Sequence, residues 1–328
     1  MKSRLHTLDE IKFPVENELK KFSEFFKQAM RSNITIVDTI ARYIVKQKGK
    51  RIRPILVFLT AKTCGEINES TFRGATLVEI LHTATLVHDD VVDDADTRRG
   101  FASINAVWKN KIAVLMGDYL LSTGLLVALR SNDIYFLKTV SEAVRLMSEG
   151  EILQIKKSRE LDIDEETYLK IISSKTASLL STCSEIGAAS VSEDKEQIQL
   201  MKDYGENVGL AFQIRDDLLD YTSRTNIIGK PIGGDLKEKK ITLPLIYAFL
   251  QAPKQESKKV LKMIKKGSTA KDIGYVVKFT QEYGGIDYAR NKAEFFGEKA
   301  KVCLKSFKES EAKNSLLAFV DFVMEREK

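Results

Sequence analysis

Two apolar helical segments of this chain each end in the acidic pattern Asp-Asp-x-x-Asp. The six aspartates are Asp89, Asp90 and Asp93 in the first segment and Asp216, Asp217 and Asp220 in the second. Residues four apart share a helix face, so the outer carboxylates of each pattern lie on one side, about a turn apart. Crowded carboxylates repel one another and resist ionisation, and a bound divalent cation removes that cost.

One such segment alone is typical of a solvated acidic helix end. Two of them, 127 positions apart from residue 89 to residue 216, favour a shared site in which they face each other across a cavity. Mg²⁺ prefers oxygen ligands, keeps water molecules and binds through a few carboxylates together with substrate phosphates. We therefore expect Mg²⁺ and a diphosphate substrate between the two segments.

The composition predicts helices throughout. The 328 residues are 43% hydrophobic, which suffices for a large core, and include five prolines. Few segments show the alternation of apolar and polar residues that strands require. We find no linker, low-complexity segment or full internal repeat, so residues 1–328 are expected to form one all-α domain of about a dozen helices, with no sheet. The first helices are expected at about residues 8–29 and 33–47, and Asp164 is expected to cap a later one.

Charge, cysteines and the first residues indicate a cytoplasmic protein. The net charge of +6 is modest and is taken as spread along the chain, so no nucleic-acid-binding tail is expected. Cys64, Cys183 and Cys303 are far apart and fit free thiols in a reducing compartment. The basic N-terminus lacks the apolar core of a signal peptide. Residues 112–129 are long enough for a membrane span, yet Asp118 near their middle favours a buried core helix.

Two further segments carry cations suited to phosphate. Residues 46–54, KQKGKRIRP, form either a solvated loop or a nucleic-acid patch, and no other basic cluster supports the second interpretation. Gly49 can let the backbone turn there, with the cations of Lys50 and Arg53 beside it. Residues 229–244 break the helical pattern, so they form either a plain linker or a basic loop able to close over a polyanion.

In this order and spacing, the motifs resemble those of the trans-isoprenyl diphosphate synthases (polyprenyl synthases) over roughly residues 46–326. The family pattern Gly-Lys-x-x-Arg matches Gly49, Lys50 and Arg53, and Arg-Arg-Gly matches residues 98–100. The resemblance implies helices around a central cavity, magnesium-dependent prenyl transfer between an allylic diphosphate and isopentenyl diphosphate, and a homodimer. Neither a nucleic-acid partner nor a membrane span is expected, although a peripheral membrane contact could accompany product release.

The resemblance also implies roles for individual residues. The expected magnesium ligands are Asp89, Asp93, Asp216 and Asp220, and Asp90 joins them as a catalytic residue. The residues expected to bind isopentenyl diphosphate are Lys50, Arg53, His82 and Arg99. The residues expected at the allylic or departing diphosphate are Arg98, Lys175, Thr176, Gln213, Lys230 and Lys240. The segment GEILQ, residues 150–154, is a weak signal alone but resembles a family pattern, and Lys239 stands where the family usually has glycine.

Without the resemblance, several of these residues have ordinary explanations. A lone histidine such as His82 is usually a satisfied core residue, and a lone Lys-Thr pair such as Lys175–Thr176 usually lies on the surface. Gln213 precedes Asp216 by three positions and shares its helix face.

The expected product is a long chain of roughly thirty to fifty carbons. In the family, bulky aromatic residues four and five positions before the first aspartate stop elongation, and here these positions are Thr85 and Ala84. A prenyl unit is about as long as a helical turn, roughly 5 Å, so an open channel beside this helix admits several units. The channel floor is expected deeper, at side chains such as Leu81 or Leu125.

Other functions remain open at this stage. The chain could be a short-chain (farnesyl or geranylgeranyl) diphosphate synthase, or the catalytic subunit of a heteromeric synthase. A terpene cyclase would share the first acidic motif but would not need a second diphosphate site such as Lys50, Arg53 and Arg99 provide. A non-catalytic scaffold with this fold should have lost acids from one or both motifs, and both are intact.

Overall fold

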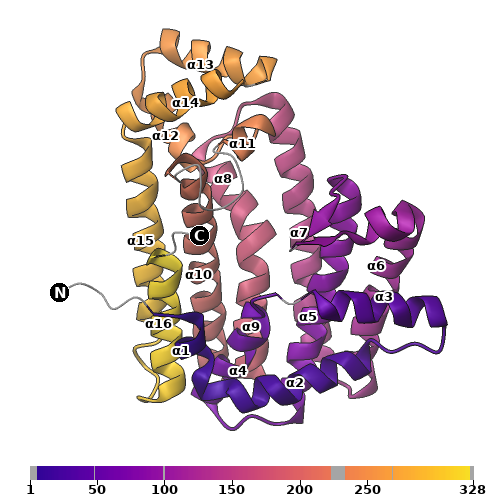
Figure 1. Ribbon diagram of the computed structural model, residues 1–328. Helices are drawn as coiled ribbons and strands as arrows, with labels where there is room; N and C mark the ends of the chain where they lie inside the picture. Colours follow the sequence, from indigo (N-terminus) through magenta and orange to yellow (C-terminus); the bar gives the residue numbers. More distant parts are fainter. Residues whose placement is uncertain (1–5, 48, 99, 223–232, 268, 326–328) are drawn as a thin grey trace.

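The computed structural model describes residues 6–325 except 48, 99, 223–232 and 268. Figure 1 shows an assembly of long helices that lie side by side, with shorter helices across both ends. The first half contains α1 (Leu8–Lys12), α2 (Glu16–Ala29), α3 (Thr35–Lys46), α4 (Ile52–Cys64), α5 (Glu69–Val92), α6 (Ile104–Arg130) and α7 (Ile134–Glu160). The second half contains α8 (Glu165–Ile172), α9 (Ser178–Ala189), α10 (Lys195–Thr222), α11 (Gly234–Lys237), α12 (Leu243–Gln251), α13 (Lys254–Lys266), α14 (Ala270–Glu282), α15 (Gly285–Cys303) and α16 (Glu311–Glu325). The all-α expectation is confirmed.

Several helices begin where a polar side chain can satisfy the first free backbone N–H groups. Asn68 accepts hydrogen bonds from the backbone nitrogens of Ser70 and Thr71 at the start of α5. Asp164 accepts one from the backbone nitrogen of Thr167 at 2.8 Å. The expectation that Asp164 caps a helix is therefore confirmed.

Two local expectations differ from the structure. The helix expected at residues 8–29 is divided by the 3₁₀ turn η1 (Phe13–Val15), because Pro14 lacks the N–H that a continuous α-helix needs. The chain also contains a minimal antiparallel pair, β1 (Thr97–Arg98) with β2 (Phe101–Ala102), where no sheet was expected. Gly100, with φ +79°, adopts a left-handed conformation in the turn between them.

The central element of the core is α9. Every residue from Leu179 to Ala188 is buried, and α4, α5, α7 and α10 all pack against this helix. A helix that is buried on all sides needs no polar face, and the charged Glu185 within α9 is paired with Tyr135 and Lys202. α9 therefore holds α5 and α10, the two helices that end in acidic motifs, in one rigid frame (Figure 1).

The expectation of a buried core helix at residues 112–129 is confirmed for one face of the helix and wrong for the other. α6 packs against α5 through residues such as Met116 and Leu120. Its opposite face exposes the large apolar side chains Val114, Leu115, Leu126 and Leu129. In the part of the chain that the structure describes, α6 is the one helix long and apolar enough to cross a membrane, and 33% of its most apolar window is buried.

The C-terminal helices break at proline and glycine positions. α12 ends before Ala252–Pro253, α13 ends just before Gly267, and α15 begins at Gly285. The helices α13 and α14 lie across the end of the molecule that also carries α11 and α12, at the top of Figure 1.

Candidate active site

The first acidic motif occupies the C-terminal end of α5. Asp89 is half-buried in the last turn, and Asp93 caps the helix by donating its backbone N–H to the carbonyl oxygen of Asp89 at 2.8 Å. Burial raises the pKa of Asp89. The nearby carboxylate of Glu151 raises it further, whereas the ammonium of Lys175 lowers it. α7 and the segment that contains Lys175 therefore approach the first motif closely enough to act on its charge.

Asp90, the middle aspartate of this motif, faces the chain rather than solvent. Its side chain is buried and accepts a hydrogen bond from Nε of Arg98 at 2.5 Å. Asn105 donates to the carbonyl oxygens of Asp90 and Ala95, both at 3.2 Å. These contacts hold the β1–β2 turn against the end of α5. Asp90 thus positions Arg98, and its carboxylate is already engaged.

Arg98 lines a small cavity of about 50 Å³ with residues of α2, α3, α5 and the basic loop at residues 46–54. Gly49 and Arg51 of that loop also line this cavity. The structure therefore places Arg98, expected at the allylic diphosphate, beside the loop expected to bind isopentenyl diphosphate. Arg51 has a left-handed backbone with φ 51°, and its guanidinium donates to Oγ of Ser23 on α2 at 2.5 Å.

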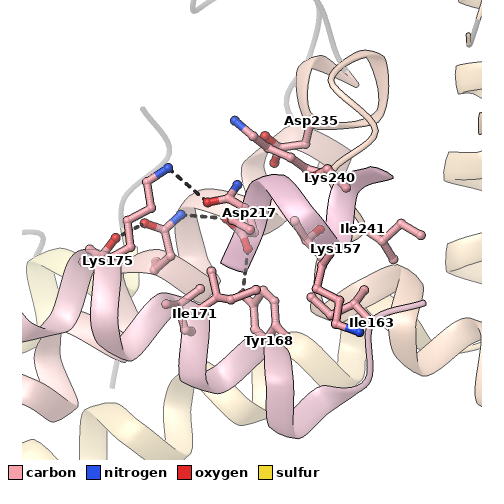
Figure 2. Close-up of a pocket in the computed structure, with 15 residues that line it drawn as sticks. Lys157, Ile163, Tyr168, Ile171, Lys175, Asp217, Asp235, Lys240 and Ile241 are labelled. Carbon is pink, nitrogen blue, oxygen red and sulfur yellow. Dashed lines mark hydrogen bonds between the residues drawn. The ribbon is translucent and has the colours of Figure 1, made fainter. Parts of the chain in front are cut away.

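A second cavity, of about 130 Å³, lies beside the second acidic motif (Figure 2). Residues from α7, α8, α10 and α11, from the turn that follows α8 and from the segment just before α12 line it. The lining residues are Gln154, Lys157, Ser158, Ile163, Tyr168, Ile171, Ile172, Lys175, Thr176, Gln213, Asp217, Asp235, Lys240, Ile241 and Thr242. Four residues expected at the diphosphates are among them, namely Lys175, Thr176, Gln213 and Lys240.

Lys175 and Thr176 belong to a five-residue π-helix, η2 (Ser173–Ala177), between α8 and α9. Glycines of two neighbouring helices allow it to fit. A Cβ atom on Gly150 of α7 would lie 2.9 Å from Cβ of Ser174, and one on Gly209 of α10 would lie 2.5 Å from Cα of Ala177. Single π-turns occur frequently at functional sites. Here the π-turn accompanies the projection of Lys175 and Thr176 into the larger cavity.

A chain of hydrogen bonds joins this π-helix to the second acidic motif. Oγ1 of Thr176 donates to Oε1 of Gln213 at 2.8 Å, and Nε2 of Gln213 donates to Oδ1 of Asp217 at 2.8 Å. The hydroxyl of Tyr168 donates to the other oxygen of Asp217 at 2.6 Å (Figure 2). Burial and the charge of Asp235 raise the pKa of Asp217 to about 8. Asp217, like Asp90, is therefore a buried anchor for a neighbouring polar residue.

The outer aspartates of the second motif have different surroundings. Asp216 is exposed, whereas Asp220 accepts hydrogen bonds from the backbone nitrogens of Gly234 at 2.9 Å and Asp235 at 3.2 Å. Burial and the charge of Asp220 raise the pKa of Asp235 to about 6. Lys240 reaches the same cavity and donates to Glu238 at 2.5 Å. Lys239, at the family's usual glycine position, has a left-handed backbone with φ 58°.

Sequence reasoning missed Glu151 as a member of this site. Glu151 forms an ion pair with Lys175, and Gln154, three positions later on the same helix, accepts a hydrogen bond from Nζ of Lys175 at 3.0 Å. The spacing of Glu151 and Gln154 within GEILQ puts both on one helix face. That spacing was the available signal, but nothing in the sequence tells which residue this face meets.

The remaining expected residues that the structure describes lie just before α4, within α4 and within α5. Lys50 is exposed, Arg53 is half-buried and His82 is buried. Burial raises the pKa of Cys183 on α9 to about 12, and Arg53 lies close enough to lower it. Arg53 therefore reaches the interior beside α9. Arg99 and Lys230 lie outside the described residues.

The two residues expected to set chain length are also on α5. Ala84 is buried, and Thr85 is half-buried with its hydroxyl bonded to the carbonyl oxygen of His82 at 2.8 Å. Leu81, suggested as a channel floor, packs towards α6, where a Cβ on Gly124 would lie 3.1 Å from its Cγ.

The four expected metal ligands are divided between two helix ends. Among the described residues, no three histidine, cysteine or acidic side chains are gathered into a ready-made metal cluster. The donors nevertheless fit a hard divalent cation bound jointly with phosphates, because all of them are carboxylates. The raised pKa of Asp89 agrees with this chemistry, since it reflects a buried negative charge beside other acids.

Comparison with known proteins identifies similar chains. A sequence model described as polyprenyl synthetase matches residues 34–280. An octaprenyl diphosphate synthase of Haemophilus influenzae is 32% identical over 99% of both chains. An all-trans-nonaprenyl-diphosphate synthase (geranyl-diphosphate specific) of Rhodobacter capsulatus is 35% identical over 95% of this chain and 96% of that one. The crystal structure of a polyprenyl synthase from Caulobacter crescentus, complexed with calcium and isoprenyl diphosphate, superposes with a TM-score of 0.90 at 32% identity over 99% of both chains.

Proposed function

Since this chain belongs to the polyprenyl synthetase family and is a prenyl-transferring enzyme, we propose that it extends an allylic diphosphate with isopentenyl diphosphate units to a long all-trans polyprenyl diphosphate, using Mg²⁺. The observation that carries this proposal is the arrangement around the larger cavity. Lys175 and Thr176 project there from the π-helix, and the buried Asp217 orients Gln213 beside them. This is a cradle for an anion, next to acidic side chains suited to a divalent cation.

The cation would be held between the two acidic motifs. The residues that would hold Mg²⁺ are Asp89, Asp93, Asp216 and Asp220. When bound, Mg²⁺ supplies positive charge to a diphosphate leaving group. Asp220 would have to exchange its contacts with the backbone of α11 to take part.

The chain's own cations would stabilise the charge that develops when the allylic carbon–oxygen bond breaks. Glu151 and Gln154 hold the ammonium group of Lys175 near the expected position of the leaving diphosphate. Little reorganisation of this side chain is therefore needed at the moment of reaction. The bonding electron pair leaves with the diphosphate. Lys240 on the opposite wall of the cavity, and Lys230 by family resemblance, would add to this stabilisation.

Isopentenyl diphosphate, the second substrate, would be bound on the side of the smaller cavity, which Gly49 and Arg51 help to line. Lys50, Arg53, His82 and Arg99 would hold isopentenyl diphosphate with its double bond facing the allylic carbon. That double bond supplies the electron pair for the new carbon–carbon bond. A proton is then lost to the released diphosphate, which restores a double bond and completes one elongation. Arg98, fixed by Asp90, stands at the cavity shared with Gly49 and can serve the diphosphate on that side.

A long product is supported by the small residues before Asp89. Ala84 and Thr85 leave no aromatic side chain one turn below the motif, and the hydroxyl of Thr85 is turned back onto its own helix. Relatives named as octaprenyl and nonaprenyl diphosphate synthases agree with a product of roughly thirty to fifty carbons at about 5 Å per unit.

We further propose a cytoplasmic homodimer formed through α6. The exposed apolar side chains Val114, Leu115, Leu126 and Leu129 fall on one face of this helix. A patch of this kind favours association, and a second copy of the same face is self-complementary. The free thiols of Cys64, Cys183 and Cys303 fit a reducing compartment.

Turnover of labelled isopentenyl diphosphate with an allylic primer tests the proposed function. We expect the purified protein to incorporate label and release diphosphate when Mg²⁺ is present, and to lose both activities when a chelator removes it. Absence of incorporation under all metal conditions would refute the proposal for this chain alone.

A further inference from the structure

One face of α13 carries six lysines and no acidic residue. They are Lys254, Lys258, Lys259, Lys262, Lys265 and Lys266, and all six are exposed. At about 100° per residue they span roughly 140° of the helix circumference. Val260 and Ile264 are buried on the opposite side and attach the helix to the body of the protein. Glu256 falls outside the lysine face.

The two helices α13 and α14, which include this lysine face, together carry a net charge close to that of the whole chain. Residues 254–282, which form α13 and α14, contain eight lysines against three acidic residues, a net charge of +5 out of +6 for the whole chain. The expectation of an evenly spread charge is therefore wrong. Most solvated helices mix both signs, because lysines four positions apart repel each other.

In the part of the chain that the structure describes, the lysines of α13 are not paired with acidic residues. Among the described residues, none of the six forms a salt bridge, although Lys259 donates to the hydroxyl of Tyr275 at 3.2 Å and lies 4.4 Å from the centre of its ring. Other exposed lysines of the chain do have such partners, for example Lys27 with Glu24. The six charges on this face are thus available to an external anionic surface.

The position of α13 relates this surface to the active site. α13 packs on α14, which packs on α12. These helices lie at the same end of the molecule as α11 (Figure 1), and Asp235 of α11 lines the larger cavity. Leu250, four positions before Lys254, is 70% exposed at the end of α12. An exposed apolar side chain beside a row of lysines is typical of proteins that rest on the surface of an anionic bilayer.

We propose that the lysine face of α13 docks the enzyme on an anionic lipid bilayer. The reason for such docking rests on the proposed function, because a long polyprenyl chain is insoluble in water and must pass from the enzyme into lipid. Charge complementarity identifies the occupant. A nucleic acid is disfavoured, since the lysine face includes no arginine and no aromatic residue to stack on bases.

Flotation with lipid vesicles tests the proposal without any turnover. The full-length protein would be mixed with vesicles of phosphatidylcholine alone or of equal parts phosphatidylcholine and phosphatidylglycerol. The test variant is Lys258→Gln/Lys262→Gln/Lys265→Gln, which keeps helix propensity because glutamine and lysine are nearly equal in it. The matched control is Lys20→Gln/Lys21→Gln/Lys27→Gln on α2, which removes the same charge from other exposed positions.

We expect binding to the anionic vesicles that is lost in about 1 M salt, where charge screening reaches about 3 Å. The α13 variant should bind at least about tenfold more weakly, whereas the α2 variant should bind like the wild type. Equal binding to neutral vesicles, equal binding by the two variants, or preferential binding to polyuridylate over vesicles would each overturn the proposal. An active enzyme that ignores vesicles would refute docking alone, and a vesicle-bound protein without turnover would refute the proposed function alone.

Discussion

Lys175 of the π-helix forms an ion pair with Glu151 of α7, and Glu151 in turn lies close enough to Asp89 to raise its pKa. The pair connects a cation expected at the leaving diphosphate with the first acidic motif. Glu151 therefore serves as a positioning residue for Lys175, in an arrangement that also depends on the close approach of Gly150 to Ser174.

We expect Glu151→Gln to lower kcat/KM by roughly tenfold, because Lys175 loses the negative charge that holds it in position. A tenfold change corresponds to a loss of about 1.4 kcal/mol in transition-state stabilisation. Lys175→Met should cost more, on the order of a hundredfold. Steady-state kinetics with varied allylic substrate measures both effects. Glu149→Gln is the control, since Glu149 lies on the same helix but pairs with Arg145. Wild-type kinetics in Glu151→Gln would show that the ion pair has no catalytic consequence.

Asp89→Ala and Asp216→Ala should each abolish turnover while the helical fold persists. Both motifs are needed to hold the cation. Removal of either carboxylate relieves local charge repulsion and leaves the packing of the helices in place. An activity assay and circular dichroism on the same samples measure the two outcomes. A tenfold loss of rate corresponds to about 1.4 kcal/mol of transition-state stabilisation. If either variant kept more than about a tenth of the wild-type rate, the shared-cation account would be contradicted.

Tyr168→Phe should destabilise the protein by about 1–3 kcal/mol, because the buried carboxyl group of Asp217 loses its hydrogen bond with the Tyr168 hydroxyl at 2.6 Å. Urea denaturation measures the change. Tyr275→Phe removes a half-buried hydroxyl that contacts Lys259 near the surface, and it should change stability by less than about 0.5 kcal/mol. If the two variants were equally stable, Asp217 would not depend on Tyr168.

Ala84→Phe and Thr85→Phe should shorten the product, because each puts an aromatic ring about one turn below Asp89. The half-buried Thr85 keeps the test valid if the larger change at buried Ala84 impairs folding. Mass spectrometry of dephosphorylated products gives the chain length. Val92→Phe, at an exposed position of the same helix, should leave it unchanged. If the wild type and the three variants gave identical products, a residue other than Ala84 or Thr85 would set the product length.

Leu115→Glu should separate the proposed dimer into monomers. Leu115 is 63% exposed on the apolar face of α6, so the folded subunit tolerates a charge there while an interface does not. Light scattering at micromolar protein gives the mass, and Gln281→Glu, at an exposed position of α14, controls for the added charge. A wild-type protein that is monomeric in this measurement would remove the dimer from the account.

Local sequence patterns predicted those features of the fold that interactions between residues near in sequence determine. The ends of α5 and α10, the cap at Asp164 and the C-terminal breaks follow from periodicity, capping and glycine or proline positions. The exposed face of α6 was not predictable in this way, because hydrophobicity does not reveal whether a neighbouring helix or a second copy covers a residue. The β1–β2 pair is two residues long on each strand, too short for any alternation to be seen.

The same limit applies to the candidate site. The spacing of the acidic motifs pointed to Asp89 and Asp216, but tertiary packing decides which carboxyl groups are buried against neighbouring side chains. Asp90 is buried against Arg98 and Asp217 against Tyr168 and Gln213, and neither contact can be read from spacing. Glu151 was missed for the same reason, since its partner is 24 positions away in the chain, at Lys175.

The mass spectrum of the products formed from farnesyl diphosphate and labelled isopentenyl diphosphate tests the central claim most directly. The account predicts magnesium-dependent polyprenyl diphosphates of roughly thirty to fifty carbons, each about one helical turn longer than the last. No elongated product, or products that stop at about fifteen or twenty carbons with Ala84 and Thr85 intact, would contradict it.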